Sequence, residues 1–238
     1  MNRTFTETET KFHDHTGFIV IDPEKGKTIF EYQSDRYFTP ASNTKILTLF
    51  TAFTVLGDSL PGLRYTITED SLIFWGTGDP SFLNHLCYSN DRVYQFLKRS
   101  PKAIYFSPSN SYMTHFGPGW AWSDYDENYS QERSVFPIYG NSFQLLPLPD
   151  QILVVPPFFR QFLSIGDRKK YADVDRDIAS NDFVLHPGLN GQFSDMLVPF
   201  RTSPQLVVDL LKDTLRRDVG LVEKPIDYRA QTLFSVPA

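Results

Sequence analysis

The stretch Ser42-Asn43-Thr44-Lys45 has the pattern S-x-x-K and leads directly into an apolar run that stops at Gly57. A serine and a lysine three residues apart lie on one face of a helix, with their Cβ atoms about 5–6 Å apart. At that separation the lysine amine can reach the serine hydroxyl and take its proton. A weak nucleophile then becomes one that can attack an amide carbonyl. The stretch therefore indicates a nucleophilic serine, with a lysine as its base, at the head of a helix.

The residues that follow this motif are stronger evidence for a catalytic role than the four residues of the motif. By itself, S-x-x-K also fits a helix N-cap serine followed by a solvated lysine. Residues 46–56 are apolar almost all round the helix, which predicts a buried central helix, and Gly57 suits its C-terminal cap. Burial and the positive end of the helix dipole both disfavour an ammonium ion. We therefore expect Lys45 to act as a base near neutral pH.

Composition limits the class of protein. The 238 residues suffice for one large domain or two small ones, and a hydrophobic content of 41% provides for a core. The net charge of −5 argues against nucleic acid as a partner. An aromatic content of 15% fits a cleft for saccharides or peptides, or simply an aromatic core. No motif indicates a metal or another cofactor, so we expect neither.

The compartment is only partly constrained. Cys87 is the single cysteine, so no disulfide can form within the chain. No stretch of 18 or more apolar residues occurs, so we expect no membrane span. Residues 1–15 are polar and lack the apolar core of a secretory signal. Either the protein stays in the cytosol or a signal has been removed.

The order of the expected elements suggests an α+β fold. Residues 1–15 should be weakly structured, 17–22 and 27–32 should form a hairpin, and residues 59–62 should break the chain after the first helix. Further strands are expected at 64–68, 71–76, 103–107, 134–138, 141–146, 151–155 and 182–186, and helices at 90–99 and 203–219.

The β-rich middle looks like an insertion into an outer unit. We therefore divide the chain into a first part at 1–63, an inserted β-rich domain at 64–200, and a return to the outer domain at 201–238.

Four stretches in this order resemble the D-alanyl-D-alanine carboxypeptidases of the penicillin-binding protein type, in the low-molecular-mass class C branch that carries a large inserted domain. They are Pro40–Lys45, Gly76–Pro80, Gly119–Asp124, and Val198–Phe200 leading into the 203–219 helix. The first also occurs in β-lactamases, whereas the G-D-P and G-W-x-W-x-D stretches are more specific. The resemblance implies a β-lactamase/transpeptidase-like domain and a location in the periplasm or cell envelope.

The resemblance also implies a mechanism. Ser42 would attack the carbonyl between the last two D-alanines of a peptidoglycan stem peptide, with Lys45 as base, and water would release the acyl-enzyme. A β-lactam would acylate Ser42 for longer. The Ser42 N–H would form half of the oxyanion hole. Asp124 would bind the amino-bearing side chain of the substrate, although it also fits a plain turn residue. We expect Trp120 and Trp122 to be packing anchors.

The other two family motifs, S-x-N and K-T-G, do not occur. Ser180–Asp182 has the letters of S-x-N in the wrong order. Tyr139–Asn141 matches the Y-x-N of class C β-lactamases, but its place in the β-rich region favours a turn. His186–Gly188 resembles an H-x-G variant, but its proline favours a loop.

We therefore expect this chain to be the N-terminal half of the enzyme, with little peptidase activity by itself. The helix after Lys45 would lack part of its cover, so self-association is possible. Two alternatives stay open: a non-catalytic cell-envelope binding module that uses the β-rich middle, and a β-lactamase-like hydrolase that uses Tyr139. The sequence does not choose between carboxypeptidase and endopeptidase action.

Overall fold

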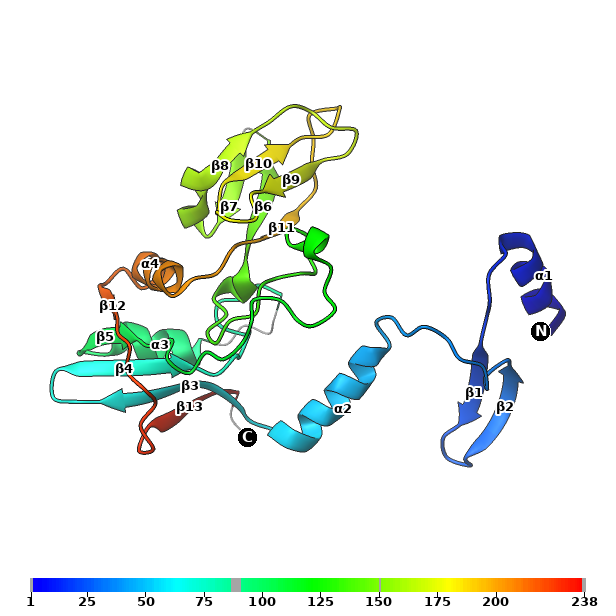
Figure 1. Ribbon diagram of the computed structural model, residues 1–238, viewed down its shortest axis with the longest axis horizontal. Helices are drawn as coiled ribbons and strands as arrows, with labels where there is room; N and C mark the ends of the chain where they lie inside the picture. Colours follow the sequence, from blue (N-terminus) through cyan, green and yellow to red (C-terminus); the bar gives the residue numbers. More distant parts are fainter. Residues whose placement is uncertain (1, 87–90, 150, 237–238) are drawn as a thin grey trace. The chain divides into compact units, whose positions relative to one another are not determined.

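The computed structural model describes residues 2–86, 91–149 and 151–236 (Figure 1). It separates into two compact units, Met1–Val55 and Leu56–Ala238, and each is described here by itself. Cys87 and the expected helix start at Asn90 lie outside the described residues. The division of the chain at residues 63 and 200 stays a prediction.

The first unit contains a hairpin and two helices. Its elements are α1 (Asn2–Phe12), β1 (Phe18–Asp22), β2 (Lys27–Tyr32) and α2 (Thr44–Leu56), whose last residue belongs to the second unit. Strands β1 and β2 are antiparallel, with Phe18 opposite Tyr32. Gly26 has φ +60° in the turn, a conformation that glycine adopts at little cost. The hairpin expected from the sequence is confirmed.

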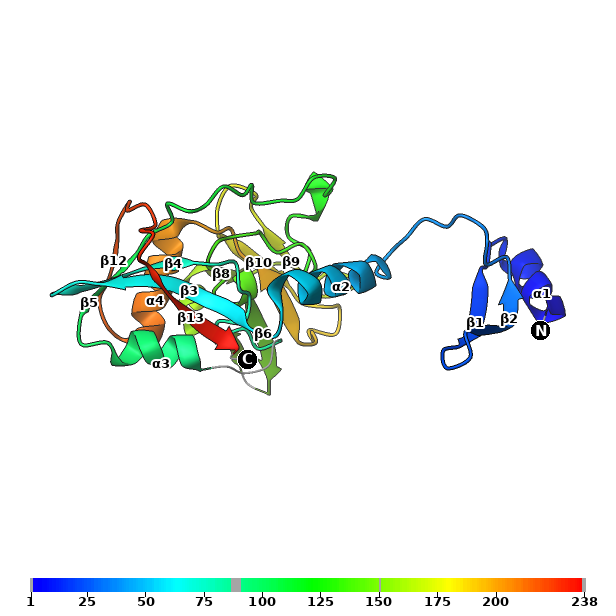
Figure 2. The same ribbon diagram turned by 90° about the horizontal axis from the view of Figure 1, so that it is seen from below.

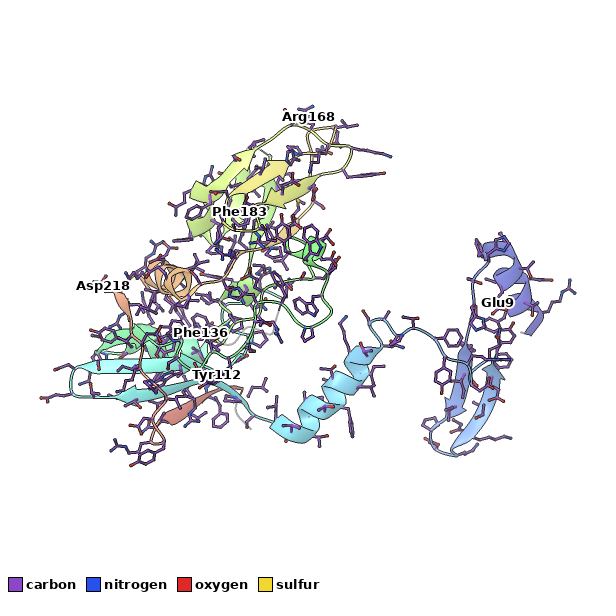
Figure 3. The ribbon with its side chains drawn as sticks, viewed as in Figure 1. Glu9, Tyr112, Phe136, Arg168, Phe183 and Asp218 are labelled. Carbon is purple, nitrogen blue, oxygen red and sulfur yellow. The ribbon has the colours of Figure 1, made fainter. Side chains whose placement is uncertain are left out.

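Helix α1 corrects the expectation that residues 1–15 are weakly structured. The Phe5 ring lies 5.0 Å from the ring of Tyr32 and 5.4 Å from that of Phe18. One turn later, Glu9 accepts hydrogen bonds from the Tyr32 hydroxyl at 2.7 Å and the Gln33 amide at 2.9 Å (Figure 3). Residues four apart share a helix face, so both side chains meet the hairpin at once. These tertiary contacts stabilise a segment with few apolar residues.

Helix α2 corrects a second expectation, because none of its residues is buried. Leu47 is 70% exposed and Phe50 is 72% exposed. The rest of the first unit is small, and the aromatic side chains of its hairpin pack against α1 rather than α2. The apolar sequence predicts this helix correctly. The first unit, however, does not supply side chains that bury its apolar surface.

The second unit is organised around a five-stranded mixed sheet with the order β12-β5-β4-β3-β13 (Figure 2). Its strands are β3 (Leu60–Ile67), β4 (Ser71–Gly76), β5 (Ala103–Phe106), β12 (Val219–Leu221) and β13 (Gln231–Val236). Helix α3 (Arg92–Arg99) contacts β13, helix α4 (Pro204–Leu215) contacts β12, and the two helices touch each other. The end of the chain thus completes a sheet that begins at residue 60.

Two three-stranded sheets form the remainder of this unit. Their orders are β11-β6-β7 and β8-β10-β9. The strands are β6 (Ser142–Leu148), β7 (Gln151–Val155), β8 (Leu163–Ile165), β9 (Asp173–Arg176), β10 (Phe183–His186) and β11 (Met196–Pro199). Three phenylalanines form an aromatic cluster in the core: Phe143, Phe159 and Phe183 are in mutual ring contact, and Figure 3 marks Phe183 there. This mixed architecture confirms the α+β class.

Three boundaries differ from the sequence prediction. Strand β3 begins at Leu60, inside the expected break, because residues 60–65 pair with β13 far along the chain. Residues 135–138 are buried, but the strand expected at 134–138 does not form. Helix α4 ends at Leu215 rather than Val219, because Arg216 adopts a left-handed conformation with φ +53°. The residues that follow are used for β12 instead.

Candidate active site

The two residues of the S-x-x-K motif are in direct contact. The Nζ atom of Lys45 lies 2.8 Å from the Oγ atom of Ser42. A tight turn places them, because the Lys45 N–H donates to the Ser42 carbonyl at 3.1 Å and the Asn43 side chain accepts from the Ala41 N–H at 2.9 Å. Ser42 therefore stands just before α2, with the lysine one turn further on.

This arrangement can move a proton. At 2.8 Å an ammonium donates to the hydroxyl, whereas a neutral amine accepts the hydroxyl proton. The Ser42 N–H makes no hydrogen bond to any described residue, as is usual for the first N–H groups of a helix. Lys45 is exposed. The first unit therefore does not supply the burial that the sequence led us to expect for this lysine.

Asp124 belongs to the second unit and lies at the end of a 3-10 turn, Trp122–Asp124. Its carboxylate accepts hydrogen bonds from Ser123 Oγ at 3.0 Å and from the Tyr129 hydroxyl at 3.2 Å. The side chain is partly exposed. The structure brings Tyr129 to Asp124, and the sequence reading missed that residue. The pKa of Tyr129 is raised, first by desolvation and then by its hydrogen bond to Asp124.

The two nearby tryptophans differ. Trp120 is 44% exposed, and its ring packs near Phe116 with the centroids 6.2 Å apart. Trp122 is 81% exposed, so the expectation that it anchors packing is wrong for that residue.

The imperfect motif matches have structural roles. Tyr139–Asn141 is a 3-10 turn, which confirms that prediction, and the Tyr139 hydroxyl is hydrogen-bonded to Thr214 at 2.7 Å. Asn181 uses both ends of its amide to hold the backbone of Arg201. His186 ends β10, and its Nε2 atom lies 3.1 Å from Asp175. Each of these groups is engaged by partners within the second unit.

No helix of the described residues is both long enough and apolar enough to cross a membrane. In the same part of the chain, no cluster of three or more His, Cys, Asp or Glu side chains is arranged to hold a metal ion.

Comparison with known proteins decides the family. Residues 6–146 match the model of the D-Ala-D-Ala carboxypeptidase 3 (S13) family, which is more than half of the chain. The chain belongs to this family. The result confirms the resemblance to carboxypeptidases of the penicillin-binding protein type. No curated protein matches the S13 chain.

One solved structure shows the fold. Penicillin binding protein 4 of Haemophilus influenzae matches with a TM-score of 0.57 and 20% identity, over 92% of this chain and 55% of that one. The same protein in complex with a novel β-lactam matches with a TM-score of 0.48 and 17% identity, over 92% and 53%. The S13 chain thus spans about half the length of these structures, and its fold is part of the penicillin-binding protein fold.

Proposed function

We propose that this chain carries the nucleophile of a serine-type D-Ala-D-Ala carboxypeptidase or endopeptidase that acts on peptidoglycan stem peptides. The supporting observation is the 2.8 Å contact between Lys45 Nζ and Ser42 Oγ, in a chain of the S13 family. Lys45 removes the hydroxyl proton as Ser42 attacks the carbonyl carbon, and the proton then passes to the leaving amine. The resulting ester, the acyl-enzyme, is hydrolysed by water.

The Ser42 N–H supports this proposal further. It is unbonded among the described residues and lies at the start of α2, where backbone N–H groups favour negative charge. It supplies one of the two donors that an oxyanion requires. Asp124 holds the amino-bearing side chain of the stem peptide. β-Lactams acylate the same serine, and the protein works in the periplasm or cell envelope.

The test is covalent labelling of the complete gene product with a fluorescent penicillin, followed by mass spectrometry of the labelled peptide. The label should sit on Ser42, disappear in Ser42→Ala, and persist in the control Ser34→Ala, an exposed serine of the same unit. Labelling that survives in Ser42→Ala would refute the assignment.

The 238 residues by themselves should acylate slowly. The chain spans 55% of the Haemophilus influenzae structure, and groups that act as a unit lose most of their effect when some are removed. Rapid stoichiometric labelling of Ser42 in the isolated chain would contradict this statement. The exposed face of α2, which includes Leu47 and Phe50, should also drive self-association of the isolated chain. Sedimentation equilibrium should show oligomers that Phe50→Glu reduces.

A binding module is the second candidate, and exposed aromatic side chains favour it. Tyr112 is 92% exposed, Trp122 81% and Tyr129 66%, all in one long connection of the second unit. Figure 3 marks Tyr112 there. If the complete Ser42→Ala protein loses penicillin labelling, the enzyme reading holds. If the wild type never labels but co-sediments with peptidoglycan, the binding module replaces it.

A further inference from the structure

A pocket of about 80 Å³ in the second unit has no part in the proposed peptidase chemistry. It lies where the end of β5, the connection after it, residues 133–136 and the start of α4 come together. The volume has room for roughly five water-sized groups. Its apolar wall includes Phe106, Phe136 and Val207, all nearly fully buried, and Figure 3 marks Phe136.

One polar side of the pocket is set by a buried carboxylate. Glu132 is only 4% exposed, and its Oε2 atom lies 2.6 Å from the Nδ1 atom of His115. The same oxygen accepts hydrogen bonds from the N–H and hydroxyl of Thr202. A carboxylate on Nδ1 requires the proton there and fixes the ring orientation. The Nε2 atom of His115, a residue that lines the pocket, makes no hydrogen bond to a described residue.

Two serines of the lining also have protons to donate. Ser203 Oγ accepts from the Leu206 N–H at 3.1 Å, and Ser134 Oγ accepts from the Asn141 amide at 2.9 Å, so each hydroxyl keeps its own proton for another acceptor. The pocket therefore favours a ligand with acceptor atoms.

The charges point in the same direction. No acidic residue occurs among the described residues that line the pocket, whereas Arg133 does line it. Glu132, behind the pocket, is engaged by His115 and Thr202 and is also attracted to the buried Arg176. The positive end of α4 begins next to Ser203. An anion is favoured there over a neutral molecule or a cation.

We propose that this pocket binds a small monocarboxylate with a short hydrocarbon chain. The carboxylate accepts hydrogen bonds from His115 Nε2 and from the Ser134 and Ser203 hydroxyls, and the hydrocarbon part packs against Phe136 and Val207. A free amino acid is a poorer ligand, because its ammonium group meets no acidic side chain in the lining. The proposal is separate from the peptidase reaction, since it uses none of Ser42, Lys45 and Asp124, and every residue that it uses lies in the second unit.

The methionines provide a direct readout. The chain has three, of which Met113 lines the pocket and Met196, in β11, does not. With methyl-13C-methionine in the 238-residue chain, sodium propionate should shift the Met113 methyl signal saturably and leave Met196 unmoved. Propionamide, which has the same shape without the charge, should bind at least tenfold more weakly. Propylammonium should not bind, and D-alanine should bind more weakly than propionate.

Variants assign the site. His115→Ala should weaken propionate binding at least tenfold, whereas the control His13→Ala, an exposed histidine of the first unit, should leave it unchanged. His115→Ala removes a partner of the buried Glu132 and can impair folding, so Ser134→Ala serves as a second variant and should weaken binding several-fold. The proposal is overturned if propionate gives no saturable shift of Met113, if propionamide binds equally well, or if a folded His115→Ala binds as the wild type does.

Discussion

Glu132 and Thr202 are 70 residues apart in the sequence, yet one carboxylate oxygen of Glu132 accepts two hydrogen bonds from Thr202. The backbone N–H donates at 2.7 Å and the hydroxyl at 2.8 Å. These two hydrogen bonds link the irregular segment before Val135 to the residues just before α4. Because Glu132 is only 4% exposed, these bonds stabilise a carboxylate that water hardly reaches.

Replacement of Thr202 by valine should destabilise the protein. Thr202→Val keeps the shape of the side chain and the backbone bond but removes the hydroxyl donor from a buried carboxylate, which costs about 1–3 kcal/mol. Urea unfolding of the 238-residue chain measures the change. Thr66→Val is the matched control, because the Thr66 hydroxyl is buried without a partner among the described residues. It should be neutral or stabilising, and equal losses in the two variants would contradict the role of the Glu132–Thr202 bond.

Two glycines with similar backbones should respond differently to alanine. Gly140 has φ +66° and Gly78 has φ +79°, so both substitutions cost about 1–2 kcal/mol for a left-handed residue with a Cβ atom. A Cβ at Gly140 would lie 2.6 Å from the Asn84 amide nitrogen, whereas none of the neighbours of Gly78 lies within 4 Å. Asn84 would have to give up its 3.1 Å bond to the Pro80 carbonyl.

Gly140→Ala should therefore lose about 0.5–1.5 kcal/mol more than Gly78→Ala, the contribution of one hydrogen bond. Thermal unfolding of the two variants provides the comparison. An equal or smaller loss for Gly140→Ala would show that Asn84 moves away without cost.

The sequence predicted local elements well where short-range pattern alone decides them. The hairpin of residues 18–32 has runs rich in β-branched and aromatic residues on both sides of a Gly-containing turn, and α4 has a Ser203 cap followed by a proline at its first position. The S-x-x-K spacing likewise predicted the contact between Ser42 and Lys45, because three residues of helical backbone bring the two side chains together.

The sequence did not predict the elements that depend on contacts between residues far apart in the chain. Helix α1 depends on ring contacts between Phe5 and the hairpin, which no window around residues 2–12 contains. The start of β3 depends on β13, whose residues come about 170 positions later, and loop-closing pairs of that kind leave no local signal. Tyr129 reaches Asp124 only through the path of the connection between them. Its five-residue spacing fits no regular element.

The lysine of the motif can be tested without disturbing the fold. Lys45→Arg keeps the positive charge and some reach to Ser42, but a guanidinium does not give up its proton and so cannot act as a base. In the complete gene product, penicillin acylation should slow by about 10²–10⁴-fold, the usual contribution of a general base. Lys45 is exposed, so the melting temperature of Lys45→Arg should equal that of the wild type. Lys27→Arg, at another exposed lysine of the first unit, should acylate as the wild type does.

The proposed role of Asp124 predicts a change in substrate affinity. Asp124→Asn in the complete gene product should raise KM about tenfold for a stem peptide with a free side-chain amine, because a charge pair of roughly 1.4 kcal/mol is lost. A peptide with that amine acetylated should show no such change, and kcat should be little affected. If both peptides lose equally, Asp124 supports the turn around Trp122 instead of the substrate.

Asp175 makes stability depend on acid pH. Its hydrogen bond from Lys169, at 2.8 Å, is the main cause that holds the pKa of the Asp175 carboxyl below its ordinary value of 3.8. The folded state therefore favours the ionised form. The resulting stability is fully present above the ordinary pKa and is lost as the pH falls through the lowered one. The contribution is small because the side chain is 53% exposed.

Asp175→Asn should therefore flatten the loss of stability between about pH 5 and pH 2, with little change at pH 7 beyond a fixed offset. Melting temperatures across that range give the comparison. Asp195→Asn, at an exposed aspartate of the same unit, should retain the wild-type slope. A wild-type slope in Asp175→Asn would mean that other carboxylates carry the acid dependence.

The pairing of β13 with β3 places Val236 opposite Leu60. Adjacent strands run about 4.8 Å apart, so Leu60 and Val236, in the first and last strands of the described part of this unit, are neighbours. A domain whose two ends lie close together can be inserted into a surface turn of another protein without separating the two sides of that turn. The same closeness favours circular permutation, in which the two ends are joined and new ends are made in a surface loop.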